Sequence, residues 1–211
     1  MEAAPFESNR NLARRAYRLF VGDDLRSDAE IAAVRIGPPD VLDGQITLDE
    51  YDAAWPRLFE REVERIRSAL GDRALLIEHV GSTSVPGLPA KPRIDMVLAV
   101  ADSSDEPGYV PSLEAAGYVL RVREPAWYEH RVFKGPDTDI NLHVFSMDCP
   151  EIERMLRFRD HLRVDDDDRL LYEQTKRELA KRTWKYMQHY ADAKTAVVEE
   201  ILVRALAAPD R

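Results

Sequence analysis

Residues 77–100 read IEHVGSTSVPGLPAKPRIDMVLAV, and this stretch decides the fold. It begins within an apolar run from Ala74 to Val80, which predicts a short buried strand. A turn-rich segment of hydroxyl-bearing residues, glycines and prolines follows. The run from Ile94 to Val100 predicts a second strand, and Asp95 is its only charged residue. The order is therefore strand, small-residue turn and acidic strand.

The acidic strand and the turn before it have two interpretations. A carboxylate inside an apolar strand is costly to desolvate unless a cation, a metal or several hydrogen-bond donors meet it. Small residues in a turn leave backbone N–H groups free to approach an anion such as phosphate. From the spacing alone, the stretch is either a cradle for a nucleoside phosphate and its metal, or a tight connection whose aspartate caps local structure.

The run from His79 to Asp95 resembles the signature of the GrpB-like family. That family is similar in fold to the nucleotidyltransferase superfamily that includes DNA polymerase β. The superfamily pattern is Gly-Ser, a short gap, and then Asp-x-Asp or Asp-x-Glu on a strand. Gly81-Ser82 and Asp95 keep this register, whereas Val97 stands where the second acid would be. The departure weakens the expectation of metal-dependent transfer and leaves nucleotide binding in place.

The resemblance covers about residues 45–206 and implies an α+β fold. We expect a nucleotidyltransferase-like small mixed β-sheet backed by helices, with a helical C-terminal part. Residues 1–40 are predicted to be a short helical N-terminal extension, and residues 41–211 a GrpB-like nucleotidyltransferase-fold domain. The extension is either a helical hairpin packed on the main body or an interaction arm.

Periodicity and end signals predict the elements around this centre. A helix over 11–20 and a capping box at Ser27 are expected in the extension, followed by a short strand over 45–48. A helix should begin near Ala54 and end at Gly71. Further along, a helix is predicted over 110–116, and strands over 118–122, 128–134 and 139–145. Helices are predicted from Pro150, over 170–190 and over 195–206.

Composition limits the partners and the location. The formal net charge of −9 argues against non-specific binding to nucleic acid or anionic lipid, but it permits a local basic pocket. Cys149 is the only cysteine, and no apolar run reaches the ~18 residues of a membrane span. The first residues lack a basic segment followed by an apolar one. We expect a cytoplasmic monomer or homodimer that binds a nucleotide and a small molecule, and neither nucleic acid nor membrane.

Candidate metal and catalytic residues lie on the predicted strands. Magnesium prefers oxygen ligands, usually one or two carboxylates together with phosphates and water. The candidate ligands of Mg²⁺ or Mn²⁺ are Asp95, Asp139, Asn141 and His143, of which the last three alternate on one strand face. Leu142 to Phe145 resembles the family's Leu-His-Val-Phe signature, which favours His143. The candidate catalytic residues are Asp95, His143 and His79, and two histidines with one aspartate would also suit zinc or manganese. A histidine on a strand is, however, more often structural than catalytic.

Candidate phosphate-binding residues are the small turn residues and several cations. Lys91 lies between two prolines of the turn, and Arg159 and Arg163, four apart, are expected on one helix face. Arg159 has an alternative role as the ion-pair partner of Asp160 or of nearby glutamates. The complete candidate set is Gly81, Ser82, Thr83, Ser84, Lys91, Arg131, Arg159, Arg163 and Lys176.

Three functions follow from these residues. The first is a nucleotide-binding protein that transfers a nucleotidyl group from an NTP to a small molecule or a protein. The second is a non-catalytic nucleotide-binding or regulatory module, which is implied by the family's occurrence fused to dephospho-coenzyme A kinase. The third is a small-molecule enzyme that uses His79, Asp95 and His143 for acid–base or metal chemistry.

Overall fold

A five-stranded mixed sheet forms the centre of the structure, a computed structural model that describes residues 25–38, 41–42 and 45–207. The strand order is β1-β2-β5-β4-β3. β2 and β5 run parallel, and the other neighbouring pairs are antiparallel. The strands are β1 (Leu76–Val80), β2 (Ile94–Val100), β3 (Val119–Glu124), β4 (His130–Lys134) and β5 (Ile140–Ser146).

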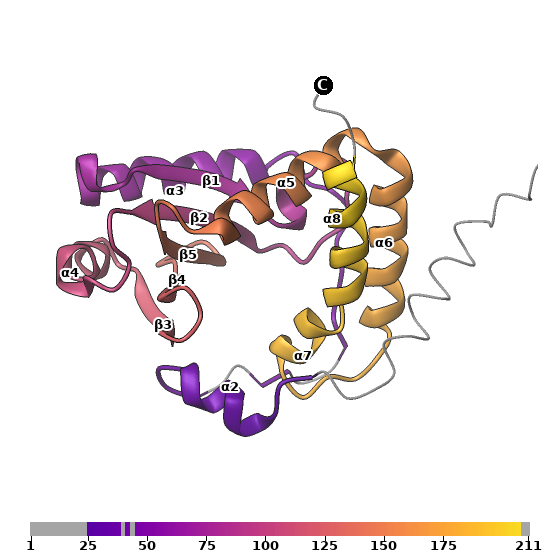
Figure 1. The fold of residues 1–211 in the computed structure, drawn as a ribbon, viewed down its shortest axis with the longest axis horizontal. Helices are drawn as coiled ribbons and strands as arrows, with labels where there is room; N and C mark the ends of the chain where they lie inside the picture. Colours follow the sequence, from indigo (N-terminus) through magenta and orange to yellow (C-terminus); the bar gives the residue numbers. More distant parts are fainter. Residues whose placement is uncertain (1–24, 39–40, 43–44, 208–211) are drawn as a thin grey trace, which may run out of the picture.

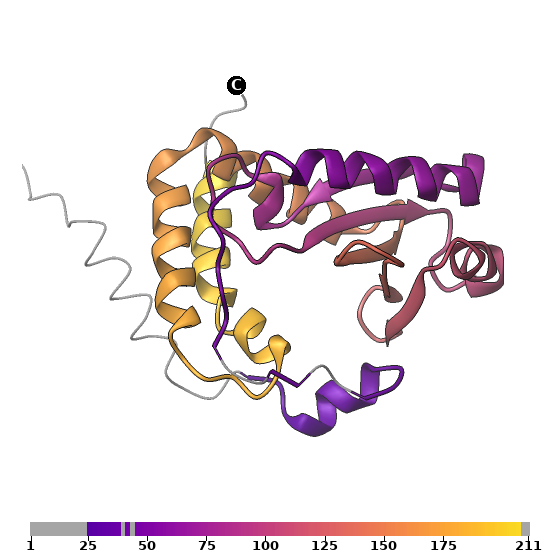
Figure 2. The same ribbon diagram turned by 180° about the vertical axis from the view of Figure 1, so that it is seen from behind.

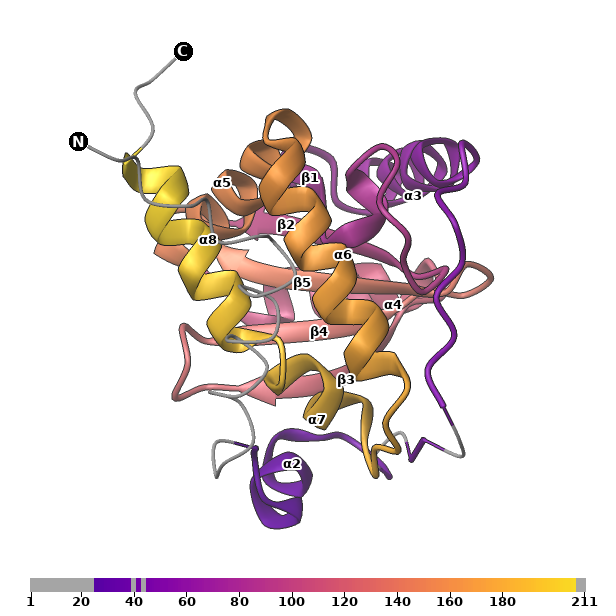
Figure 3. The ribbon, with the colours of Figure 1, turned by 90° about the vertical axis from the view of Figure 1, so that its right-hand side faces the viewer.

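Helices lie on both faces of this sheet and close one of its edges (Figures 1 and 2). They are α2 (Asp28–Val34), α3 (Trp55–Leu70), α4 (Val110–Ala115), α5 (Pro150–Val164), α6 (Asp166–Ala180), α7 (Met187–Asp192) and α8 (Thr195–Ala207), with short 3-10 turns η1 (Gly71–Arg73), η2 (Ser82–Ser84) and η3 (Glu106–Gly108). Figure 3 shows α6 and α8 crossing in front of the strands, with α7 and α2 beyond β3. The predicted α+β fold, a mixed sheet backed by helices, is confirmed.

The main hydrophobic core lies between α3, α4 and one face of the sheet. Ile94, Met96 and Leu98 alternate along β2 toward this core, and each is at most 1% exposed. Ile66 and Leu70 of α3 pack against them. The opposite sheet face carries Asp95 and its neighbours, so the period of two in β2 separates the core from the polar face.

The ends of α3 follow from local chemistry, as predicted. Pro56 occupies the first helical turn, where its missing N–H costs no hydrogen bond. Gly71 follows the last residue with φ 56°, a conformation that favours glycine. In the extension, the predicted capping box is also present: Ser27 Oγ accepts from the N–H of Glu30, whose carboxylate accepts from the N–H of Ser27.

Two predicted elements are wrong. Residues 45–48 form no strand, because this segment pairs only through single bridges, from Gln45 to Thr183 and from Asp49 to Ala90. The helix predicted over 170–190 begins earlier, at Asp166, because the side chain of Asp165 caps the N–H of Asp168 at 2.9 Å. It ends at Ala180, and α7 begins separately at Met187. The helix predicted over 11–20 lies outside the described residues.

Part of the predicted extension, the helix α2, packs against the rest of the structure. α2 lies between β3 and α7, where Arg35 bridges to Val122 and the side chain of His189 contacts the carbonyl oxygen of Arg26 at 3.0 Å. Ile31 is 2% exposed.

Among the helices within the described residues, none is both long and apolar enough to cross a membrane.

Candidate functional site

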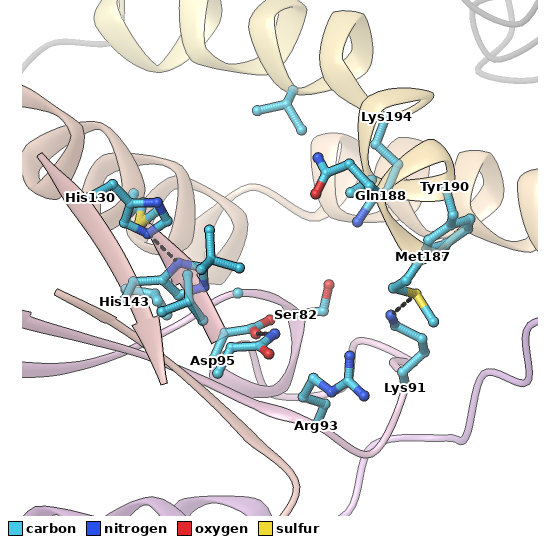
Figure 4. A pocket seen from close by; sticks show the side chains of 18 of the residues that line it. Ser82, Lys91, Arg93, Asp95, His130, His143, Met187, Gln188, Tyr190 and Lys194 are labelled. Carbon is cyan, nitrogen blue, oxygen red and sulfur yellow. Dashed lines mark hydrogen bonds between the residues drawn. The ribbon is translucent and has the colours of Figure 1, made fainter. Parts of the chain in front are cut away.

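A pocket of about 440 Å³ lies between the polar face of the sheet and the C-terminal helices (Figure 4). Its sheet wall comes from the turn after β1 and from β2, β5, β4 and β3, and the opposite wall comes from α6, α7 and α8. α2 and α5 close two further sides. The volume is within the usual range of small-molecule sites.

Asp95 is the carboxylate at the centre of the sheet wall. Its cross-strand partners are Val80 on β1 and Asn141 on β5. Asn141 Nδ2 donates to Asp95 Oδ1 at 2.7 Å, and Lys134 Nζ donates to Asn141 Oδ1 at 2.7 Å. These two bonds fix the orientation of the Asn141 amide, because only its nitrogen can donate to the carboxylate.

The turn after β1 approaches Asp95 closely. Gly81 has φ 70°, and a Cβ built on it would lie 2.6 Å from Asp95 Oδ2. Lys176 on α6 donates to Ser82 Oγ at 3.1 Å and to the carbonyl oxygen of Pro89, so it ties both ends of this turn to the helix. Ser84 is hydrogen-bonded within the turn to Gly81. Because the turn consists of small residues, its backbone lies close to the Asp95 carboxylate with no large side chain between them.

Three lysines converge on the pocket. Lys91 contacts Met187 Sδ and lies over the ring of Tyr190, as Lys194 also does, with 4.8 Å from Lys194 Nζ to the ring centroid (Figure 4). Lys176 is 2% exposed. Within the described part of the chain, the structure gives none of the three an ion pair with a carboxylate. The pocket therefore holds lysine amines that, among the described residues, no carboxylate contacts directly.

Burial changes the protonation of two of these amines. Burial, together with the neighbouring Lys194, lowers the pKa of Lys91 from 10.5 to about 7. Burial also lowers the pKa of Lys176 well below its ordinary value. Both amines would be favoured in their charged form by an incoming anion.

Three side chains joined by hydrogen bonds, those of Glu124, His130 and His143, lie beside Asp95. The Glu124 carboxylate is 2.7 Å from His130 Nδ1, and His130 Nε2 is 3.0 Å from His143 Nδ1 (Figure 4). Burial lowers the pKa of His130, and burial followed by the nearness of His130 lowers that of His143 to about 4. Both rings are therefore neutral at neutral pH, and both line the pocket.

The structure does not bring His79 together with His143. On β1, His79 pairs with Met96 and points to the α3 side of the sheet, where its ring stacks on Phe59 with centroids 4.9 Å apart. Its Nε2 lies 3.0 Å from Thr83 Oγ1. The one-residue offset from Val80 places His79 on the opposite face from Asp95, so His79 does not share the pocket that Asp95 and His143 line.

The predicted arginines also lie outside the pocket lining. Arg159 is bound by Glu78 at 2.6 Å and by Asp160 at 2.8 Å, which is the structural alternative considered for it. Arg163 donates to the carbonyl oxygen of Ser84. Arg131 is 4% exposed on the core side of β4, where it pairs with Glu106 at 2.6 Å.

The candidate metal ligands are only partly assembled. Asp139 lies beside Arg93 at 2.8 Å outside the pocket lining, and Asn141 Oδ1 already accepts from Lys134. Among the described residues, the group of three possible ligands whose atoms lie within 4.8 Å is His161, Asp165 and Asp168, at the junction of α5 and α6. Asp168 in that group is also bound by Arg204 at 2.6 Å.

Several pocket residues were not predicted. Met187 and Tyr190 come from α7, and Lys194 comes from the turn between α7 and α8. Periodicity alone did not indicate that these side chains face the sheet. His130 was on a predicted strand, whereas Glu124 lies two residues beyond the strand predicted over 118–122. Their placement on either side of a hairpin was a usable signal. His130 aligns with Glu124 across the strands, and both point away from the core.

The comparisons with known proteins agree with this architecture. Residues 45–204 match the family described as GrpB protein. The chain belongs to the GrpB family. UPF0157 protein BH1888 of Halalkalibacterium halodurans is 61% identical over 85% of this chain and 92% of its own. The crystal structure of GrpB from Enterococcus faecalis matches with a TM-score of 0.65 and 32% identity, covering 76% of this chain and 98% of that one.

A more distant solved structure is that of an RNA-modifying enzyme. A cytoplasmic RNA terminal U-transferase matches with a TM-score of 0.44 and 12% identity, covering 82% of this chain and 46% of that chain. The resemblance of residues 79–95 to the GrpB signature is confirmed by the family match, which includes the whole turn and Asp95.

Proposed function

We propose that this GrpB protein binds a nucleoside triphosphate in the pocket and transfers its nucleotidyl group to a small molecule or a protein. The phosphates lie between Lys91 and Lys194, beside the Gly81-Ser82 turn. The observation that carries the proposal is the convergence of three lysines without a carboxylate ion pair in a pocket that also contains Asp95. A polyphosphate would supply the anionic partner that these lysines lack, because its oxygens accept charge-assisted hydrogen bonds from protonated amines.

The carboxylates suit one divalent ion and not two. Asp95 has one oxygen bonded to Asn141, and its remaining capacity would serve Mg²⁺ or Mn²⁺ together with phosphate oxygens. The position of the second acid is Val97, which is 0% exposed. When bound, the ion would neutralise phosphate charge and polarise the reacting phosphorus. The protein's own contribution is to place the phosphates between Lys91 and Lys194.

A non-catalytic nucleotide-binding module is the second candidate, and Val97 is the observation that favours it. Loss of a metal-binding acid costs a two-ion reaction several kcal/mol of transition-state stabilisation. Binding does not need this acid, since the lysines and the turn are unaffected. Binding and turnover are therefore tested separately.

The binding test compares nucleotides with their unphosphorylated nucleosides. Thermal unfolding of the purified protein is followed with each NTP, and with each nucleoside, in the presence and absence of Mg²⁺ or Mn²⁺. A ligand that binds only the native state raises the unfolding temperature. We expect at least one NTP to raise it and the matching nucleoside to have little effect. Equal shifts, or none, would refute phosphate binding.

Turnover is measured as pyrophosphate release from the NTP that binds, with a pool of small hydroxyl and amino compounds as acceptors. Asp95→Asn keeps the size of the side chain and the oxygen that accepts from Asn141, but it removes the negative charge and the second acceptor oxygen. We expect release by the wild-type protein and at least a 100-fold slower release by the variant. Saturable binding without release under either metal would leave the non-catalytic module.

A further inference from the structure

The hydrogen bonds that join Glu124, His130 and His143 determine which ring nitrogens carry a proton. A carboxylate only accepts hydrogen bonds, so Nδ1 of His130 carries the proton of the 2.7 Å contact. In a neutral ring the other nitrogen, Nε2, then has no proton and can only accept. The 3.0 Å contact therefore requires a proton on Nδ1 of His143, and leaves Nε2 of His143 unprotonated.

Neighbouring side chains stabilise this arrangement of hydrogen bonds. Arg26 donates to the second oxygen of Glu124 at 2.9 Å, which favours the ionised carboxylate. Phe145 stacks on His130 with centroids 4.5 Å apart, and the planes of the two imidazoles differ by 8°. Glu124, His130 and His143 come from β3, β4 and β5, so each is supported by a strand.

Nε2 of His143 has no hydrogen-bond partner among the described residues. In the part of the chain that the structure describes, the ring of His143 forms no hydrogen bond other than the one to His130. His143 is only partly buried and lines the pocket, two residues along β5 from Asn141, the partner of Asp95. A lone pair directed at a pocket beside an acidic centre is suited to accept a proton from a ligand.

We propose that Nε2 of His143 is the base that removes the proton from the acceptor hydroxyl, and that His130 and Glu124 are positioning residues that set its tautomer. The proposal rests on the transfer reaction proposed above. The acceptor oxygen forms a bond to the α-phosphorus as its proton passes to Nε2. The bond from that phosphorus to the bridging oxygen breaks, and pyrophosphate leaves with the electron pair. The Glu124 carboxylate stabilises the resulting imidazolium through His130.

The first test needs neither nucleotide nor acceptor. In protein labelled with ¹⁵N at histidine, NMR shifts distinguish a protonated from an unprotonated ring nitrogen. We expect wild-type His143 to carry its proton on Nδ1, and His130→Phe to move it to Nε2, because the acceptor for Nδ1–H is lost. A proton on Nε2 of His143 in the wild-type protein would overturn the proposal, whether or not the variant folds.

The second test separates the base from nucleotide binding. Glu124→Gln keeps the shape of the side chain and removes its charge, and His143→Gln removes the base. We expect each to slow pyrophosphate release, His143→Gln by at least about 100-fold, with nucleotide affinity within about two-fold of wild type. Glu129→Gln, an exposed glutamate near the same hairpin, is the matched control.

The outcomes of the two tests are distinct. An unchanged release rate in His143→Gln overturns the assignment of the base. A wild-type protein that binds nucleotide but never releases pyrophosphate also overturns it. A wild-type protein that binds no nucleotide refutes instead the proposed function, and the tautomer measurement then still reports whether the hydrogen-bonded chain exists.

Discussion

At the scale of single residues, Gly81 determines how closely the turn approaches Asp95. Any side chain there would meet the carboxylate, and φ 70° is also unfavourable for residues other than glycine. Gly87 also has a positive φ, 77°, but nothing lies within 4 Å of a Cβ built on it. Gly87 therefore serves as a comparison position with positive φ and no contact with the carboxylate.

We predict that Gly81→Ala lowers the free energy of unfolding by more than Gly87→Ala does. Gly87→Ala should cost about 1 kcal/mol, the usual penalty for alanine at positive φ. Gly81→Ala adds the displacement of Asp95, and should also abolish metal-dependent pyrophosphate release. Urea unfolding and the release assay measure both effects. Equal costs in the two variants would contradict the close approach to Asp95.

Lys91 should give the proposed nucleotide binding a pH dependence. With a pKa of about 7 instead of 10.5, its amine is largely neutral at pH 8 and charged at pH 6. Phosphate favours the charged form, so binding raises this pKa and takes up a proton. We predict weaker binding at pH 8 than at pH 6.

Proton uptake is measured by calorimetry at pH 8 in two buffers that differ in ionisation enthalpy. We expect uptake of about one proton by Lys91, with a further contribution from Lys176, whose pKa is also lowered. Lys91→Gln should reduce the uptake, whereas Lys181→Gln, an exposed lysine paired with Glu178, should not. Identical uptake in the wild-type protein and Lys91→Gln would refute the role given to Lys91.

At the scale of elements, α2 connects the sheet to the C-terminal helices. The residues that flank it contact β3 through Arg35 and α7 through Arg26, and Ile31 is its buried residue. Because Ile31 and Val34 also line the pocket, this short helix forms part of the pocket wall.

We predict that Ile31→Ala weakens nucleotide binding several-fold and lowers the free energy of unfolding by about 2 kcal/mol, the lower end for loss of a buried isoleucine. Ile36→Ala, at 36% exposure in the same segment, is the control and should change neither quantity measurably. Isothermal titration and urea unfolding provide the two readouts. Unchanged affinity in Ile31→Ala would show that α2 does not contribute to the pocket.

At the scale of the whole molecule, periodicity predicted the sheet well. The period of two in residues 94–100 and 139–145 depends on local chain geometry and burial, which the sequence contains. The helix break at 181–186 was not predictable in this way. It depends on bridges from Gln45 and Val41, which are far away in the chain.

The pocket was only partly predictable for a related reason. Asp95, Lys91 and the turn are near one another in sequence, so their grouping could be inferred. Arg159 and Arg163 were predicted from helical spacing, which places them on one face but does not say what that face meets. Lys194 is 103 residues from Lys91 and joins it only when α8 folds across the sheet.

The central claim is that Lys91 and Lys194, from opposite walls of the pocket, bind the phosphates of a nucleotide. Isothermal titration of an NTP with Mg²⁺ into wild type, the double variant K91Q/K194Q and the control K181Q tests it most directly. Each hydrogen bond to a charged group contributes about 1.5–3 kcal/mol, so we expect the double variant to bind at least about 100-fold more weakly and the control to bind as wild type does. Equal affinity in all three proteins, or no binding by any of them, would contradict the claim.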